Sequence, residues 1–201
     1  MSSCIAPTRS AGGSRTIEDP ELTAADRRAL LALARGAIAA ALNGRPAPDL
    51  PDAPGAGLPR GAFVTLEEPD GALRGCIGRI AGDRPLGDVV RTVAVSAARE
   101  DPRFPAVAPD ELPTLRIEIS VLQEPVRAER VEPARLVIGR DGLLVRRGHA
   151  VGLLLPQVAT EHALGAEAFL AAACRKAGLP PESWREPGTE VFTFQADVFG
   201  E

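Results

Sequence analysis

The sequence predicts an α+β fold (mixed α/β) in which a mixed or antiparallel sheet is flanked by helices. Three observations predict this class. Apolar residues recur at helical spacing in three separate segments. Two pairs of short β-like runs are joined by glycine-containing turns. The elements follow one another as helix, hairpin, helix, strand, hairpin, strand, helix, strand, which differs from the repeating βαβ order of a parallel sheet.

The chain begins with a segment that predicts disorder, followed by a helix with clear ends. Residues 1–20 are rich in Ser, Gly and Arg, and we expect a disordered tail there. The helix begins at Thr23, the expected N-cap, and Asp26 stands in the capping-box position. Gly44 and Pro46 end it. Its predicted buried face consists of Leu30, Leu33, Ala34, Ala37, Ile38, Ala41 and Leu42.

A hairpin and a second helix follow a loop that spans residues 43–60. Ala62–Leu66 and Leu73–Ile80 are the predicted strands, and Pro69-Asp70-Gly71 supplies the turn. The second helix follows Pro85 and ends before Pro102. Its buried face is predicted to be Leu86, Val89, Val90, Val93, Ala94, Ala97 and Ala98.

The second half of the chain predicts more strands than helices. Leu115–Val121 alternates strictly and is predicted to be a strand with one buried face. Leu136–Gly139 and Leu143–Val145 are predicted to form a second hairpin around Arg140-Asp141-Gly142. The remaining predicted elements are a strand at Ala150–Leu155 closed by Pro156, a helix with Ala166, Phe169, Leu170, Ala173, Cys174 and Ala177 on its apolar face, and a final strand at Val191–Val198.

Composition narrows the possible functions. The chain has 201 residues, a net charge of −4 and no basic run, and only 3% of its residues are aromatic, which disfavours nucleic-acid binding. It contains no apolar run of membrane-spanning length and no secretory leader pattern. Its three cysteines (Cys4, Cys76 and Cys174) never occur in CxxC spacing, so neither a disulfide framework nor a zinc site is expected. A reducing cytoplasm fits this usage best, and we expect no cofactor and no metal.

The segment Leu73–Gly78 predicts a site at Cys76. Gly75 and Gly78 lie on either side of the thiol, and glycine inside a strand indicates a bend or the close approach of another group. Arg74 and Arg79 are close in sequence and would favour a thiolate. The alternative is that Cys76 is a small buried hydrophobe in a tight bend.

Other polar residues offer weaker signals, each with a structural alternative. His149 precedes a strand and is a candidate base, although it could equally lie in a solvated turn. Glu118 lies on the polar face of its strand and is a candidate acid or base if that face is covered. Arg74 and Arg103 are candidate anion contacts, or else they form surface ion pairs with Asp101 or Glu100. Cys174 is expected to pack in the core.

Several segments together resemble one known family, the AMMECR-one domain family. The resemblance is carried by Leu73-Arg74-Gly75-Cys76-Ile77-Gly78, Asp101-Pro102-Arg103-Phe104-Pro105, Glu111-Leu112-Pro113-Thr114-Leu115, Ile117-Glu118-Ile119-Ser120-Val121-Leu122, Leu154-Leu155-Pro156-Gln157-Val158-Ala159 with Glu161, and Cys174-Arg175-Lys176-Ala177-Gly178-Leu179. These blocks occur in family order over residues 22–201. The sequence departs from the family at Ala163-Leu164, where members often carry Gly-Trp.

The resemblance implies a two-lobed domain with a cleft between the lobes. The domain is expected to span residues 21–201, with a larger lobe at about 21–124 and 188–201 and a smaller lobe at about 125–187. The chain is similar to the bacterial type called AmmeMemoRadiSam system protein A. That type implies a link to a Memo-like protein and a radical S-adenosylmethionine enzyme.

Two functional hypotheses remain open at this stage. One is a non-catalytic accessory or adaptor protein that binds such a partner. The other is a cysteine-dependent enzyme acting on a small anionic substrate in the cleft, with Cys76, Glu118 and His149 as catalytic candidates. The candidate binding residues are Arg74, Gly75, Gly78, Arg103, Phe104, Gln157 and Glu161.

Overall fold

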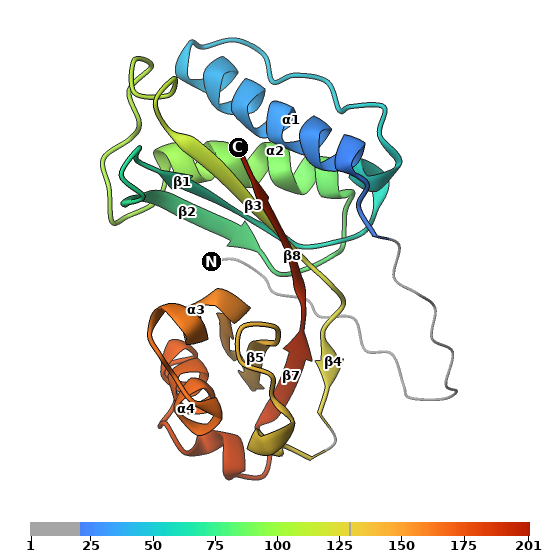
Figure 1. Ribbon diagram of the computed structural model, residues 1–201, viewed down its shortest axis with the longest axis vertical. Coiled ribbons are helices and arrows are strands. Elements are labelled where there is room, and N and C mark those ends of the chain that lie inside the picture. The colour runs from blue at the N-terminus through green and yellow to red at the C-terminus, as the bar shows by residue number, and fades with distance from the viewer. Residues whose placement is uncertain (1–20, 129) are drawn as a thin grey trace. The chain divides into compact units, whose positions relative to one another are not determined.

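The computed structural model describes residues 21–128 and 130–201, which form two compact units (Figure 1). Unit 1 runs through Val121 and includes Asp197–Glu201, and unit 2 is Leu122–Ala196. The described residues contain helices and two four-stranded antiparallel sheets, so the predicted α+β class is confirmed. The predicted disordered tail and Cys4 lie outside the described residues.

Unit 1 is a four-stranded sheet with two helices on one of its faces (Figure 1). Its strands are arranged in the order β2-β1-β3-β8. The helices are α1 (Ala24–Leu42) and α2 (Leu86–Arg99), and a 3₁₀ helix η1 (Pro54–Gly57) interrupts the long loop after α1. The strands are β1 (Ala62–Glu67), β2 (Leu73–Arg79), β3 (Arg116–Leu122) and β8 (Ala196–Gly200).

Local sequence signals explain the ends of these elements. The Thr23 hydroxyl accepts the backbone N–H of Asp26, and the Asp26 carboxylate accepts the backbone N–H of Thr23, so the predicted capping box is confirmed. The β1–β2 hairpin is also confirmed, and Gly71 supplies the positive φ of +87° that its turn requires.

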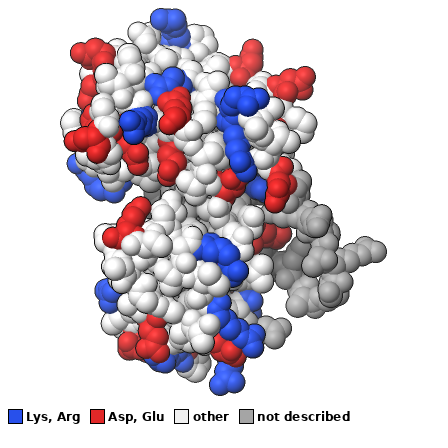
Figure 2. Space-filling model, viewed as in Figure 1, with Lys and Arg blue, Asp and Glu red and all other residues white. Residues whose placement is uncertain are grey.

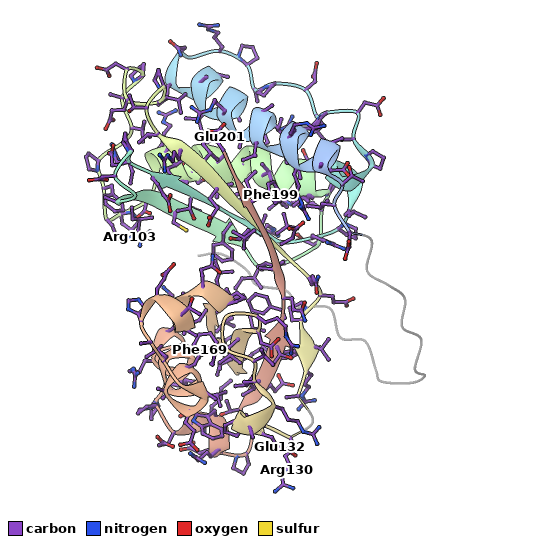
Figure 3. The ribbon with its side chains drawn as sticks, viewed as in Figure 1. Arg103, Arg130, Glu132, Phe169, Phe199 and Glu201 are labelled. Atoms are coloured by element: carbon purple, nitrogen blue, oxygen red, sulfur yellow. The ribbon has the colours of Figure 1, made fainter. Side chains whose placement is uncertain are left out.

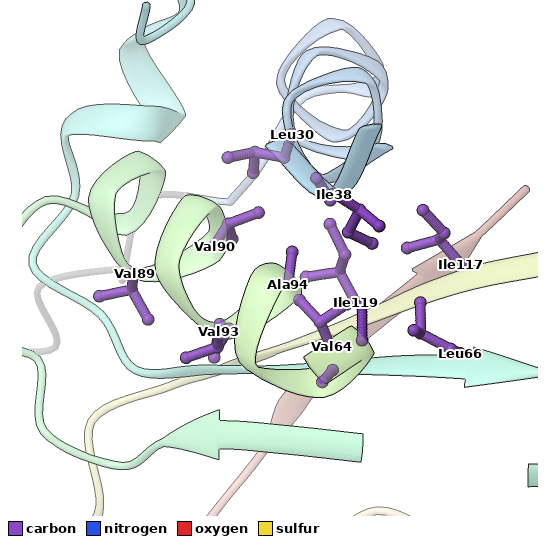
Figure 4. Packing of buried hydrophobic residues seen from close by; sticks show 14 of the residues in the cluster. Leu30, Ile38, Val64, Leu66, Val89, Val90, Val93, Ala94, Ile117 and Ile119 are labelled. Atoms are coloured by element: carbon purple, nitrogen blue, oxygen red, sulfur yellow. The ribbon is translucent and has the colours of Figure 1, made fainter. Parts of the chain in front are cut away.

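The core of unit 1 lies between the helices and one face of the sheet. Because side chains alternate along a strand, Val64 and Leu66 share this face with Ile117 and Ile119 of the neighbouring strand. They pack against Leu30 and Ile38 of α1 and the valines of α2 (Figure 4). The same alternation directs Thr65, Cys76 and Glu118 to the opposite face of the sheet.

Unit 2 has its own sheet, in the order β4-β7-β5-β6. The strands are β4 (Val126–Arg127), β5 (Gly142–Arg147), β6 (Ala150–Leu154) and β7 (Glu190–Phe194), and the helices are η2 (Pro133–Arg135), α3 (Pro156–Glu161), α4 (Ala166–Lys176) and η3 (Ser183–Arg185). The core forms where the apolar face of α4, including Phe169 and Leu170, packs against Leu143, Val145 and Trp184.

Two strand predictions in this half of the chain are wrong. Leu136–Gly139 is a turn, because the Asp141 carboxylate accepts the backbone N–H of Val137 and Gly139 has a φ of +84°. The second hairpin therefore pairs β5 with β6. The predicted strand Val191–Val198 is divided at Gln195 into β7 and β8, which belong to different sheets. The strand β4 and the short helix α3 were not predicted.

Acidic and basic side chains are interspersed over each unit on the face in view, with neither sign forming a continuous patch there (Figure 2). None of the helices in the described part of the chain combines the length and apolar character that a membrane span requires.

Candidate functional site

Strand β2 carries Cys76 at its midpoint and forms an edge of the unit 1 sheet. Cys76 lies opposite Thr65 of β1, and Thr65 lies opposite Glu118 of β3, so the three side chains form one row across the sheet. Thr65 is the nearest of these neighbours, and its hydroxyl donates a hydrogen bond to the Cys76 Sγ at 3.3 Å. Glu118 is two strands away, about 9.5 Å by the usual strand spacing.

The surroundings of Cys76 favour the neutral thiol. Burial, the largest cause, raises the pKa of the Cys76 thiol, and the negative charges of Asp101 and Glu118 raise it further. The Thr65 hydroxyl and the Arg103 guanidinium act in the opposite direction but do not reverse the shift. The prediction that neighbouring arginines would lower this pKa and favour a thiolate is therefore wrong. The cation that acts on the sulfur is Arg103, which is distant in sequence.

Both glycines beside Cys76 are explained by packing within unit 1. A Cβ at position 75 would lie 2.3 Å from the carbonyl oxygen of Ala97 at the end of α2. A Cβ at position 78 would lie 2.2 Å from the ring of Phe63. The space that each glycine leaves is occupied by the protein itself. The close approach inferred from the sequence is real, but the approaching groups are a helix and an aromatic ring.

The segment after α2 places a buried carboxylate beside the backbone of Cys76. Asp101 accepts the Cys76 backbone N–H at 2.8 Å, and the Arg103 guanidinium binds both oxygens of the same carboxylate at 2.9 and 2.6 Å. Arg103 also donates to the carbonyl oxygen of Cys76 at 3.3 Å. These donors hold the pKa of Asp101 far below its usual range, with the Arg103 guanidinium as the main cause.

The side chain of Arg103 is both held in place and open to solvent. Its side chain is 52% exposed, whereas that of Asp101 is 3% exposed. The guanidinium lies 5.4 Å from the centroid of the Phe104 ring, a cation–π arrangement. Arg103 lies at the margin of unit 1 (Figure 3). We call Thr65, Cys76, Asp101, Arg103 and Phe104 the Cys76 site.

Arg74 has a structural role instead. Its guanidinium binds both carboxylate oxygens of Glu111, at 3.2 and 3.1 Å, and donates to the carbonyl oxygen of Pro105 at 2.9 Å. The residue is buried. Glu111 also accepts the backbone N–H of Ala108, so the pair fixes the 105–111 segment beside β2. The predicted anion contact at Arg74 is already occupied by a carboxylate of the protein.

The remaining candidates lie in unit 2. His149 is exposed in the turn between β5 and β6. Gln157 and Glu161 lie on α3, which follows the other end of β6, so the length of that strand separates them from His149. Cys174 is fully buried in the unit 2 core, as predicted. The described residues contain no group of three or more His, Cys, Asp and Glu side chains placed to hold a metal ion.

Sequence reasoning missed the importance of Asp101 and Thr65. Asp101 was considered only as a surface partner for an arginine, yet it is buried and caps the backbone of β2. Its position directly after the last turn of α2 was the available signal. Counting outward from the Pro69-Asp70-Gly71 turn would place Thr65 opposite Gly75, because the register shifts by one residue between Leu66 and Glu67, so only the structure shows that Thr65 lies opposite Cys76.

Comparison with known proteins gives a consistent result. The model of the AMMECR1 family matches residues 31–199. A protein of Methanothermobacter thermautotrophicus is 48% identical over 184 residues, covering 87% of this chain and 93% of that protein. Protein TK0174 of Thermococcus kodakarensis is 47% identical over 148 residues, covering 70% and 72%. The crystal structure of the uncharacterized protein PH0010 from Pyrococcus horikoshii is similar, with a TM-score of 0.80 and 41% identity over 86% of this chain and 89% of that one.

Proposed function

The chain belongs to the AMMECR1 family, and we propose that it is an accessory protein that binds a partner protein through the Cys76 site and performs no chemistry of its own. The partners we propose are those that the family resemblance implies, a Memo-like protein and a radical S-adenosylmethionine enzyme. We place this assembly in the cytoplasm.

One observation carries the proposal: Arg103 is held rigidly and yet is half exposed. Its guanidinium is fixed by two hydrogen bonds to Asp101 and by one to the carbonyl oxygen of Cys76. An arginine that is already ordered loses little side-chain entropy on binding, and arginine and aromatic side chains are enriched among the residues that dominate interfaces. Arg103 and Phe104 supply such a pair.

The state of the thiol supports binding over catalysis. A nucleophilic cysteine needs thiolate character and a base within hydrogen-bond reach. The pKa of Cys76 is raised, chiefly by burial, and its hydrogen-bond partner is a threonine hydroxyl. The stretches of sequence that form unit 1 contain no histidine, because the chain's two histidines are His149 and His162.

The test is a binding measurement with the full chain and purified Memo-like and radical enzymes from the same organism. We expect the wild type to bind at least one of them. Cys76→Ser should bind within about twofold of the wild type, whereas Arg103→Ala should bind at least about tenfold more weakly. Arg140→Ala is the matched control, because Arg140 forms a similar two-bond pair with Asp141 in unit 2. Failure of the wild type to bind either protein, or equal binding by Arg103→Ala, would refute the proposal.

The second candidate, a cysteine-dependent enzyme, rests on the partial exposure of Cys76 and on the charge of Arg103 near its sulfur. In that case Cys76→Ala would abolish an activity of the isolated protein and leave its melting temperature nearly unchanged. Resistance of Cys76 to alkylation in the native protein at pH 8 would exclude this candidate.

A further inference from the structure

The outer edge of β2 is not paired with another described strand of its sheet, and the proposed partner binding does not explain what blocks it. An edge strand presents backbone N–H and C=O groups that can pair with a strand of another molecule, so folded proteins block such edges. In β2 the outward groups belong to alternate residues. Cys76 is one of these, because its N–H is directed to Asp101 of the following loop and not to β1. By alternation, Gly78 shares this orientation, whereas the register shift between Leu66 and Glu67 interrupts the alternation at Arg74.

Asp101 and Arg103 occupy both outward groups of Cys76. The Asp101 carboxylate accepts the N–H at 2.8 Å, and the Arg103 guanidinium donates to the C=O at 3.3 Å. A residue on a neighbouring antiparallel strand would make the same two bonds, one accepted and one donated. The two side chains also bind each other, so together they replace one residue of an added strand.

Asp101 and Arg103 block the edge of β2 at its centre, where they shorten the free stretches of strand most. Cys76 is the fourth of the seven residues of β2, so the pair interrupts the strand at its centre and leaves at most three residues on either side. The loop that carries the pair follows α2 and is closed where Val107 donates its N–H to the carbonyl oxygen of Ala98. Arg74 of β2 also binds the carbonyl oxygen of Pro105, which holds the loop against the strand.

We propose that Asp101 and Arg103 act as an edge guard that prevents β2 from pairing with β2 of a second copy of this chain. The strand is suited to such self-pairing. An antiparallel, two-fold pairing centred on Cys76 would bring its outward N–H and C=O groups to the same two groups of the second copy. Cys76 would lie opposite its own copy as a hydrogen-bonded pair. The Cα atoms of such a pair lie about 5.5 Å apart, which is within the range that a disulfide spans.

The experiment removes the guard and traps the pair. All variants carry Cys4→Ser, so that Cys76 and the fully buried Cys174 are the remaining thiols. Arg103→Ala and Asp101→Ala are compared with this parent by sedimentation over a range of concentrations and by cross-linking with diamide. Diamide accepts the two electrons and two protons that two thiols release when they form a disulfide. We expect both variants to dimerise more strongly than the parent and to form the Cys76–Cys76 disulfide at least tenfold faster.

The matched control is Arg140→Ala, because Arg140 is 55% exposed and its partner Asp141 is 9% exposed, close to the values for Arg103 and Asp101. This variant should behave as the parent does. Circular dichroism verifies the fold, and hydrogen exchange of a peptide containing Cys76 reports directly on the uncovered N–H in Asp101→Ala. If both guard variants keep the parent's association state and cross-linking rate, the proposal is overturned, whether or not they bind a Memo-like protein.

Discussion

The edge strands β2 and β6 share one feature and differ in another. β2 lies at the edge of the unit 1 sheet and β6 at the edge of the unit 2 sheet. Each has a glycine against which the backbone of a helix packs. A Cβ at Gly75 would lie 2.3 Å from the carbonyl oxygen of Ala97 in α2, and a Cβ at Gly152 would lie 2.6 Å from the carbonyl oxygen of Ala173 in α4.

The comparison shows which part of the Leu73–Gly78 motif points to function. Because Gly152 has the same packing role in β6, Gly75 is explained as a contact between strand and helix. What distinguishes β2 is the polar cap on its central residue, formed by Asp101 and Arg103. The functional argument for unit 1 therefore depends on this pair and on the thiol beside it.

The largest effect should come from filling either glycine. Gly75→Ala and Gly152→Ala each place a methyl group against helix backbone that cannot move aside, so we expect each to lower the free energy of unfolding by about 3 kcal/mol. Hydrogen exchange of peptides from α2 should report the loss in unit 1. The fluorescence of Trp184, the chain's single tryptophan, should report the loss in unit 2.

The control for these variants is Gly57→Ala, since nothing lies within 4 Å of a Cβ there and no positive φ is required. We expect a change of no more than about 0.5 kcal/mol. If Gly75→Ala were as stable as this control, the strand–helix explanation of the motif would fail. The glycine would then again be a candidate for admitting a ligand.

The next largest difference in the free energy of unfolding should be between serine substitutions at the two described cysteines. Cys174 is fully buried among apolar side chains, although the backbone N–H of Trp184 reaches its sulfur. Cys174→Ser buries a hydroxyl there and should lower the free energy of unfolding by about 1.5 kcal/mol. Cys76→Ser, beside Thr65 on the polar face, should change it by no more than about 0.5 kcal/mol. Urea unfolding measures both, and equal losses would contradict the assignment of Cys76 to a polar site.

The stability of Asp101→Asn relative to the wild type should depend on pH, and this tests whether the cap on β2 is a charged carboxylate. The folded pKa of Asp101 is lowered, so the unfolded chain binds the proton more readily, and the carboxylate stabilises the protein above the unfolded value of about 3.9. We expect Asp101→Asn to be about 1 kcal/mol less stable than the wild type at pH 7. This difference should persist to about pH 5 and shrink as the pH falls below about 4.

Urea midpoints at pH 7, 5 and 3 provide this measurement, with Arg140→Ala as a variant that leaves Asp101 untouched. A stability difference that grows as the pH falls would have the wrong sign for a carboxylate with a lowered pKa. It would show that Asp101 is not held as a charged partner of Arg103.

The sequence predicts the periodic elements of the fold well. The helices α1, α2 and α4 and the β1–β2 hairpin each have both an apolar repeat and a clear end signal, such as the capping box at Thr23 or the turn at Gly71. Leu136–Gly139 misled the prediction because a short apolar run has no distinguishing period. A single carboxylate, Asp141, holds that segment in a turn.

The division of Val191–Val198 between two sheets could not be predicted from the local sequence pattern either. Alternation continues through Gln195, and only pairing with distant strands shows where one sheet ends. For the candidate site, too, the sequence indicated residues but not their neighbours in space. Cys76 was proposed from the glycines around it and Arg103 as an anion contact, but the sequence neighbours of the thiol were taken for its spatial neighbours. The register of β2 with β1 and the path of the chain after α2 decide that Thr65 and Asp101 lie there.

The smallest expected effect concerns the charges around the thiol. The Arg103 guanidinium lowers the pKa of Cys76, and Glu118 raises it, while burial sets the overall upward direction. In the pH profile of iodoacetamide labelling, Arg103→Ala should therefore move the midpoint of Cys76 to higher pH, and Glu118→Gln should move it to lower pH. At pH 8 we expect changes of about twofold in the labelling rate. Arg140→Ala should leave the profile unchanged, because the charges that act on the thiol are those of Arg103, Asp101 and Glu118. Opposite shifts for the two substitutions are the signature of charge, since a change in solvent access alone would alter the rate without moving the midpoint. If both variants moved the midpoint in the same direction, access and not electrostatics would control this thiol, and β2 would differ from β6 in its hydrogen bonds alone.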